Sequence, residues 1–535
     1  MSRHLAVACA PLFLVISSVT GRGLADDYFL TIGGGYSPAG NQISLERNVV
    51  LFQQFLKEQY PGGVRHDVFF SDGNDAARDI QFEDPELDIP RANLLLAQVF
   101  RQTKYLRNRY RTHEVPNVRG ATSRDNITKW FDEVGSTLKA DDRLFVYVTA
   151  HGGRSTDKKT PHNTKLYLWN SRNLQMKEWV DQLSKLPDDV AVTTVMVQCY
   201  CGGFANMLFN NGDSKKGLAN AIRCGFFATT HSRPAAGCTP DINEDNYREY
   251  SSYFWQAFRG QTRTGDPIER PDYDADGKIS FAEAHAYALL TSTTVDISIK
   301  TSDAFLRAFS KTQVARPAGD KAKIEGDKSE DAGPANEPAI ELLTADTPFE
   351  KLFRLASPAD RAVLEGLSLE LGLTGPERSK QTKVRAAELT KAKKELDTLY
   401  KKKSGESGTT ANNIRKTLTN RWPELNNRWH PKTVETLADE AEELIGLIES
   451  HPDFPKLDDL RAEMKRLSHQ KLDLDRQWAK CQRLIRTLEN VALAVNLRHV
   501  ATKEAQDRYQ MLVAAESRTF GPQNSSPTST TAASK

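Results

Sequence analysis

The sequence is poor in cysteine, has almost no excess of charge of either sign, and lacks long apolar runs after its first residues. Six cysteines in 535 residues exclude a disulfide-dense secreted scaffold. With 72 Lys and Arg against 70 Asp and Glu, the net charge of +2 leaves no basic footprint for nucleic acid. We therefore expect no nucleic-acid partner and no membrane span after the N-terminal segment is removed.

The first 25 residues differ from the rest of the chain. A short basic start precedes the apolar stretch 5–19, and small residues up to Ala25 fit the rule for signal-peptide cleavage. A signal peptide over 1–25 predicts an exported protein, periplasmic or extracellular, that begins at Asp26. An N-terminal membrane anchor is the alternative. The shortness of the apolar run and its interruption by Pro11 favour cleavage.

Composition changes twice along the mature chain. The early part mixes apolar runs with turns, whereas residues 316–339 lack large apolar side chains apart from Ile324. The part that follows is rich in Leu, Glu, Lys and Ala, and the end of the chain is dominated by Ser and Thr. The predicted divisions are a first domain (26–310), a flexible linker (311–339), a helical coiled-coil-like region (340–515) and a disordered tail (516–535).

The first domain alternates strand-like and helix-like segments. Apolar runs at 144–150 and 190–197 predict buried strands, whereas 127–138 and 176–186 have the apolar spacing of amphipathic helices. Further short strands are expected at 28–32, 66–70 and 225–229. Strands separated by helices predict an α/β fold with a mostly parallel sheet covered on both faces. In such sheets, functional sites gather at the carboxyl ends of the strands.

Reactive side chains follow two of these predicted strands. His151 comes directly after one strand and before Gly152, and the motif VMVQCYCGGFA places Cys199 and Cys201 at the end of the next. A thiol needs a nearby imidazole to ionise at neutral pH, and glycines let backbone N–H groups approach a substrate carbonyl. Either residue alone is typical of a core cysteine or a surface histidine. Together they indicate nucleophilic catalysis, but the pattern does not choose between the two cysteines.

At these motifs the sequence resembles the caspase, legumain and metacaspase group of cysteine peptidases. There a His-Gly follows one strand and a Cys-x-Ser-Gly or Cys-x-Gly follows the next; here TAHGG and QCYCGGF stand in those places, within a resemblance over 27–310. The resemblance implies a caspase-like endopeptidase that cleaves a protein or peptide substrate. It implies that Cys199 is the nucleophile, that His151 is the general acid/base, and that the backbone N–H groups of Gly152 and Cys199 form the oxyanion hole.

The chain departs from that group in the region that would bind the substrate. Metacaspases and legumains carry an acidic residue two positions before the cysteine, where this sequence has Val197. Their preferences for a basic residue or an asparagine therefore do not carry over. Arg233, in the loop 230–238, is a candidate for meeting an acidic substrate side chain, and an ordinary surface arginine is the alternative.

The segment DYDADGKISFAE has the spacing of an EF-hand calcium loop. Gly277 stands at the sixth position, where the loop must turn, and Ile279 at the eighth is the usual apolar residue. The spacing predicts calcium as a cofactor, with oxygen ligands from Asp272, Asp274, Asp276, Lys278 (through its carbonyl), Ser280 and Glu283. Because one loop is evident rather than a pair, we expect a structural ion; a solvated acidic loop is the alternative.

Apolar residues from Leu457 to Val495 recur in steps of three and four, with Lys471 as the polar exception. This heptad pattern predicts an antiparallel helical hairpin or a three-helix coiled coil, and an ordinary helical bundle is the alternative. Such helices could form a homo-oligomer or bind a partner protein.

Taken together, these patterns predict an exported caspase-like cysteine endopeptidase with a structural calcium ion. A catalytically inactive binding module and a coiled-coil scaffold are the alternatives. Five cysteines follow residue 25, so at least one thiol is unpaired in an oxidising compartment. Cys224 and Cys238 could form a disulfide across a loop.

Overall fold

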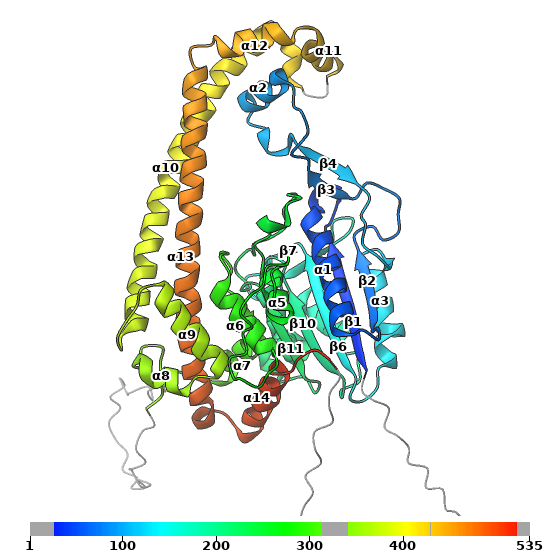
Figure 1. Cartoon of the computed structure of the whole chain (residues 1–535), viewed down its shortest axis with the longest axis vertical. Coiled ribbons are helices and arrows are strands. Elements are labelled where there is room, and N and C mark those ends of the chain that lie inside the picture. Colours follow the sequence, from blue (N-terminus) through cyan, green and yellow to red (C-terminus); the bar gives the residue numbers. More distant parts are fainter. Residues whose placement is uncertain (1–25, 313–340, 428–429, 522–535) are drawn as a thin grey trace, which may run out of the picture.

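The computed structural model describes residues 26–312, 341–427 and 430–521 (Figure 1). The predicted signal peptide, nearly all of the predicted linker and residues 522–535 of the predicted tail lie outside the described residues. Within the described ranges, each helix is too short or too polar to cross a lipid bilayer.

The first domain contains a seven-stranded sheet, as expected for an α/β fold. The strands lie in the order β12-β11-β10-β6-β1-β2-β5, and all pair in parallel except β12, which runs antiparallel to β11. Their bounds are β1 (Asp27–Gly34), β2 (Arg65–Phe70), β5 (Val118–Gly120), β6 (Arg143–Ala150), β10 (Ala191–Met196), β11 (Arg223–Phe227) and β12 (Ile299–Lys300).

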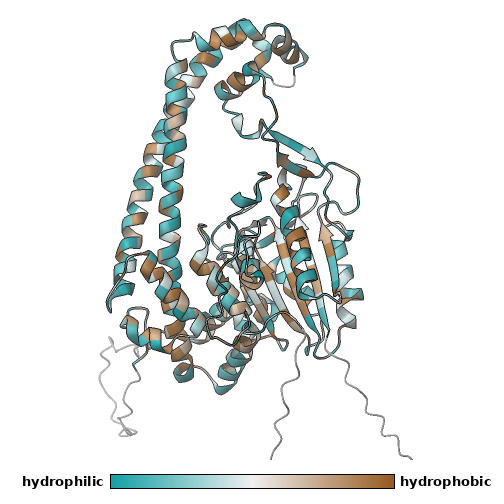
Figure 2. Cartoon of the chain, in the orientation of Figure 1, coloured by the Kyte–Doolittle hydropathy of each residue, from teal (hydrophilic) through white to brown (hydrophobic). Residues whose placement is uncertain are grey.

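Helices cover both faces of this sheet, which explains why its central strands read as continuous apolar runs. Aromatic side chains of α1 (Ile43–Gln59), α5 (Tyr250–Arg259) and α6 (Phe281–Thr291) pack on β6 and β11 over one face. The helices α3 (Arg124–Glu133) and α4 (Met176–Leu183) pack together over the other face. Figure 2 shows apolar residues concentrated along these strands and on the helices against them.

Two smaller sheets extend from the main one. The strands β3 (Ile80–Glu83) and β4 (Asn108–Arg111) form a hairpin that carries α2 (Arg91–Val99) between them. The strands β7 (Gly152–Gly153), β8 (Lys165–Leu168) and β9 (Arg172–Gln175) form an antiparallel sheet directly after β6.

The second region is helical and is dominated by an antiparallel hairpin of two long helices, in agreement with the sequence prediction (Figure 1). The 47 residues of α13 span about 70 Å at 1.5 Å per residue. The helices of this region are α8 (Phe349–Leu355), α9 (Pro358–Glu370), α10 (Arg378–Arg421), α11 (Pro431–Asp439), α12 (Ala441–Glu449) and α13 (Phe454–Val500). The last helix, α14 (Lys503–Glu516), follows them.

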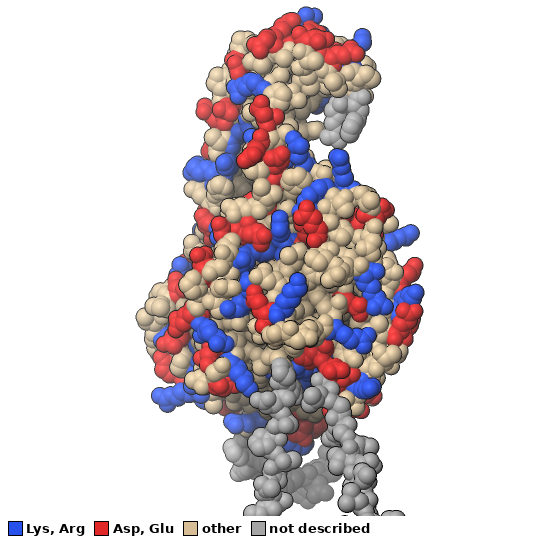
Figure 3. Space-filling view, turned by 45° about the vertical axis from the view of Figure 1, so that its right-hand side comes forward, with Lys and Arg blue, Asp and Glu red and all other residues tan. Residues whose placement is uncertain are grey.

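Most of the predicted heptad positions on α13 face the interior of this region. Leu460, Leu467 and Leu488 are buried. Lys471 instead reaches Asp397 of α10, with 2.5 Å between Nζ and Oδ1, and its side chain is 40% exposed. Lys471, the polar exception in the heptad pattern, therefore forms an ion pair at the edge of the hairpin. On the face drawn in Figure 3, acidic and basic side chains are interspersed over both regions.

The far end of the hairpin returns to the first domain. Apolar side chains of α2 pack against α10 and α12, and Leu95, Ile414 and Ile448 form the centre of this contact. Arg91 of α2 pairs with Glu449 of α12 at 2.7 Å. The helical hairpin thus forms an arch that meets the first domain at both ends (Figure 1).

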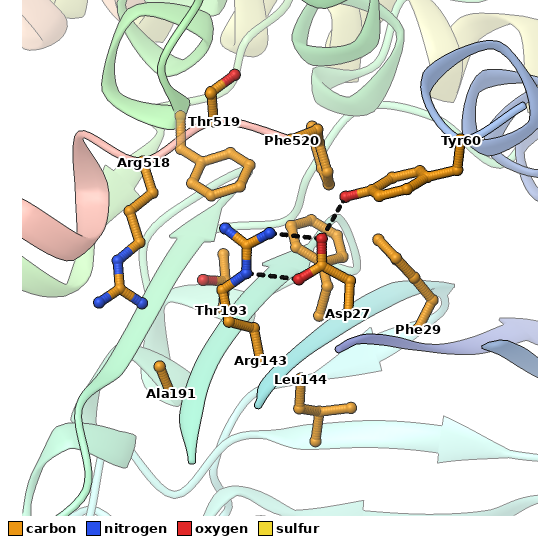
Figure 4. A pocket seen from close by; sticks show the side chains of 12 residues that line it. Asp27, Phe29, Tyr60, Arg143, Leu144, Ala191, Thr193, Arg518, Thr519 and Phe520 are labelled. Carbon is orange, nitrogen blue, oxygen red and sulfur yellow. Dashed lines mark hydrogen bonds and ion pairs between the residues drawn. The ribbon is translucent and has the colours of Figure 1, made fainter. Parts of the chain in front are cut away.

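At the other end of the hairpin, referred to below as its near end, the chain continues from α13 through α14 into the core of the first domain. Residues 516–521, assigned by sequence to the tail, are packed there: Phe520 lies against Phe145, at 5.0 Å between ring centroids, and against Phe281. Figure 4 shows Phe520 beside the ion pair of Arg143 and Asp27, and the backbone N–H of Gly521 donates to Tyr60. The C-terminal segment is therefore part of the first domain.

We predict that Phe520→Ala destabilises the whole first domain. Removing a buried phenyl ring should lower the free energy of unfolding by about 3 kcal/mol, because a cavity remains between several aromatic rings. The measurement is chemical denaturation of the full chain, with Leu472→Ala on the exposed face of α13 as the control. Equal stability of the two variants would show that the C-terminal segment does not support the core.

Candidate active site

The ends of β6 and β10 bring His151 and Cys199 to one edge of the sheet. These strands are neighbours, with Val148 opposite Met196, so the residues that follow each strand leave at the same level. The backbone of Gly152 lies against Cys199: a Cβ atom at Gly152 would come within 2.2 Å of the Cys199 carbonyl oxygen. Only glycine allows this approach.

The Cys199 thiol is partly buried and lies against the loop after β11. Its Sγ atom accepts the backbone N–H of Ala235 at 3.4 Å and faces the Ala235 carbonyl at 3.8 Å. Burial raises the pKa of Cys199, the Ala235 hydrogen bond opposes that rise, and the Asp296 carboxylate adds to it. The thiol therefore needs a base to become a nucleophile near neutral pH.

Cys201 occupies a different environment. It is fully buried, its thiol donates to the carbonyl of Thr229, and it accepts the Thr229 N–H at 3.4 Å. Burial raises its pKa well above the ordinary range of a thiol. Tyr200 between the two cysteines has a left-handed backbone, with φ of 63°, which turns the chain sharply after Cys199. Of these two cysteines, only Cys199 is partly exposed.

His151 is held by two groups in the segment before α1. Its Nε2 atom lies 2.8 Å from Oε1 of Gln42, whose own amide nitrogen donates to the Ala39 carbonyl. Burial lowers the pKa of His151, and a hydrogen bond to the Gly40 carbonyl opposes that change. In the described part of the chain, His151 and Cys199 share the sheet edge but form no hydrogen bond with each other.

Sequence reasoning missed the buried polar groups beneath this edge. Glu249 is 2% exposed, and burial raises its pKa to about 7, against the opposing effect of Arg263. The Arg263 guanidinium also donates to Asn48, which donates in turn to Thr149 of β6. These residues lie in unrelated segments without a motif, so no local pattern could have revealed them.

Cys238 also lies at this edge. Its Sγ atom is 4.0 Å from the carbonyl of Ala150, the residue before His151. Cys224 is buried within β11, and both it and Cys238 are free thiols, so the disulfide left open by the sequence is not formed.

The loop that flanks Cys199 is anchored by a helix of the second region. Asp296 accepts the backbone N–H of Ala236 at 2.7 Å. The backbone carbonyl of Asp296 in turn accepts from Arg483 of α13 at 2.8 Å. Arg483 is 1% exposed and donates to further carbonyls of the same segment. The position of this loop therefore depends on α13.

Arg233, the predicted contact for an acidic substrate, points toward α13. Its guanidinium lies over the Trp478 ring, 4.7 Å from the centroid. It lines a cavity whose wall does not include Cys199.

The predicted calcium loop brings three of its proposed ligands close together. Ligand atoms of Asp272, Asp274 and Glu283 lie within 4.8 Å of one another. Gly277 takes a left-handed φ of 83°, and Glu283 reaches back to accept the N–H and hydroxyl of Ser280. The same loop holds the C-terminal segment, because its Ile279 carbonyl accepts from the Thr519 hydroxyl.

The remaining predicted ligands, Asp276 and Lys278, lie in the same turn, where an Asp276 carboxylate oxygen accepts the Lys278 N–H at 2.8 Å. This oxygen-rich donor set fits a hard divalent cation. A second group that could hold a cation comprises Asp72, Asp79 and His113, at the end of β2.

The comparisons with known proteins do not assign a family. No protein-family model matches the chain, and no curated protein matches it. Among solved structures, protein GSU0716 from Geobacter sulfurreducens is similar over 49% of this chain and 88% of that one, at 10% sequence identity and a TM-score of 0.28. This is a distant structural match, from which we draw no conclusion about chemistry.

We predict that calcium stabilises the fold through the loop 272–283. A ligand that binds only the folded state adds about 2.7 kcal/mol when its free concentration is one hundred times its Kd. Chelation should therefore lower the melting temperature, and Glu283→Gln should abolish this calcium dependence. Glu269→Gln, an exposed change outside the loop, should retain it. A melting curve of the wild type that is independent of free Ca²⁺ would contradict a structural ion.

Proposed function

We propose that the protein is a caspase-like cysteine endopeptidase with Cys199 as nucleophile and His151 as general acid/base. The observation that carries the proposal is that three groups lie at one sheet edge: the partly exposed thiol of Cys199, the imidazole of His151, and the backbone of Gly152, which lies against Cys199. This combination supplies the groups that acyl transfer requires.

In the proposed reaction the imidazole of His151 accepts the Cys199 thiol proton as sulfur attacks the scissile carbonyl. The carbonyl π bond breaks, and the negative oxygen faces the N–H groups of Gly152 and Cys199. His151 then gives its proton to the leaving amine as the C–N bond breaks. Water next attacks the thioester carbonyl while His151 takes one of its protons. The C–S bond breaks, the carboxylic acid leaves, and His151 returns the proton to the Cys199 sulfur.

The contacts of His151 suit the proton-donating part of this cycle. Burial lowers the pKa of His151 and so favours the neutral ring that accepts the thiol proton, whereas the hydrogen bond to the Gly40 carbonyl opposes this change and favours the protonated ring that donates to the amine. We infer that Gln42 orients the ring in the resting enzyme and releases Nε2 when a leaving amine arrives.

An inactive peptide-binding module is the second candidate function. It is favoured by one observation, the raised pKa of Cys199 without a hydrogen bond from His151 in the described structure.

Three further features are also proposals. They are export after cleavage at residue 25, a structural Ca²⁺ ion, and contacts of a second copy or a partner protein with the arch of α10 and α13.

We predict different outcomes for the two cysteine-to-serine variants. Cys199→Ser should abolish peptide hydrolysis and labelling by a thiol-reactive peptide ketone, because a hydroxyl lacks the easy ionisation of a thiol. Cys201→Ser should retain most activity, since that sulfur is fully buried and bonds the Thr229 backbone. Library hydrolysis with calcium and reductant is the measurement. If Cys201→Ser is inactive while Cys199→Ser turns over, the nucleophile is misassigned.

We predict that His151→Ala folds normally and is labelled about 10²-fold more slowly near neutral pH, the usual contribution of a general base. The melting temperature and the labelling rate are measured together. A wild-type protein that neither cleaves a library peptide nor takes up the probe would favour the binding module.

A further inference from the structure

A cavity of about 460 Å³ lies between the loop after β11 and the helix α13. Its size falls in the range of small-molecule pockets. Its floor includes Gly202, three residues beyond Cys199, and its sides come from α7 (Thr301–Phe309) and α13.

The walls of this cavity are strongly basic. Five basic side chains line it, against one carboxylate: they are His162, His231, Arg233, Arg307 and Arg486, with Asp303 as the acid. The Asp303 carboxylate accepts from Asn490 at 2.8 Å, and Arg307 pairs with Glu489 at 2.9 Å. These two residues therefore have partners within the protein.

The other four basic side chains have no such partner. In the described ranges of the chain, His162, His231, Arg233 and Arg486 form no side-chain hydrogen bond or ion pair, and Arg233 and Arg486 each bury an unpaired Nε atom. The two imidazole rings lie 4.0 Å apart between centroids, and Arg233 stacks on Trp478. Arg233 and Arg486 are therefore partly buried cations whose Nε atoms lack an acceptor, and an anion between them would supply one.

We propose that this cavity binds a small molecule that carries a phosphate or sulfate group. Guanidinium groups bind such oxyanions through charge-assisted hydrogen bonds, often two at a time, and imidazole N–H groups extend the donor set. The site is separate from the proposed active site, because neither His151 nor Cys199 lines the cavity.

The protonation of the histidines gives the site a predictable dependence on pH. Burial lowers the pKa of His231 to about 4, and His162 and Arg486 add to this effect. A bound dianion would raise that pKa, so binding should be tighter at low pH and weaken as pH rises through the pKa of the complex. The titratable and charged groups that line the cavity with His231 come from four segments: His162 before β8, Arg233 after β11, Asp303 and Arg307 of α7, and Arg486 of α13.

The test is isothermal titration of the full chain with sulfate at constant ionic strength and constant free Ca²⁺. We expect saturable binding at one site, and a loss of about tenfold in affinity for Arg486→Gln, which removes one charge-assisted contact. Arg466→Gln, an exposed change on the same helix, should bind as the wild type does. His231→Asn is the second variant and should reduce the dependence of affinity on pH.

O-phosphoserine, titrated in parallel, distinguishes a carried group from a free ion. Tighter binding than sulfate, again sensitive to Arg486→Gln, would support a larger ligand, whereas sulfate binding of equal strength would support the free oxyanion. The proposal is overturned if neither probe binds saturably, or if Arg486→Gln and Arg466→Gln bind equally well. Peptide hydrolysis is not used as a readout, so the outcome is independent of the proposed peptidase.

Discussion

The hydrogen bonds of the buried Arg483 guanidinium fix the helical region against the first domain. Its donors reach the backbone carbonyl of Leu289 in the last turn of α6 and those of Ser292, Thr294 and Asp296 in the segment between α6 and β12. A guanidinium removed from water must satisfy its donors, so this segment and α13 can separate only at a large cost in free energy. The same segment presents Asp296 to the loop beside Cys199.

The helical region is joined to the first domain at both of its ends. It meets the first domain through α2 at the far end and through Arg483 and Phe520 at the near end. Glu516 strengthens the near end, since its buried carboxylate pairs with Lys300 at 3.1 Å and accepts the Ser302 N–H. The arch is thus built into the domain that carries the candidate active site, and the loop 272–283 lies where the returning chain enters the core.

The comparisons assign no family, so the geometry of the site is what supports the proposed function. Two physical features matter most there. The backbone of Gly152 approaches Cys199 more closely than any side chain would permit, and the loop after β11 covers the Cys199 sulfur on one side. The cavity that contains Arg233 and Arg486 is lined by the same loop but not by Cys199, so this loop contacts two environments of different chemistry.

The sequence alone was sufficient for features that depend on neighbours within a few residues. Continuous apolar runs predicted the central strands, because a strand covered on both faces needs apolar side chains on both. The three-four spacing predicted the long helices, and the twelve-residue spacing predicted the turn around Gly277, since both are properties of local backbone geometry.

Contacts between distant segments were decided only by the tertiary structure. The burial of Cys201, the ion pair of Lys471 with Asp397 and the direction of Arg233 each depend on a partner in another segment. Phe520 follows a stretch that reads as a polar tail, yet it fills a space between rings contributed by β1, β6, α1 and α6. Sequence spacing does not predict such a space, because the space exists only once those elements have packed together.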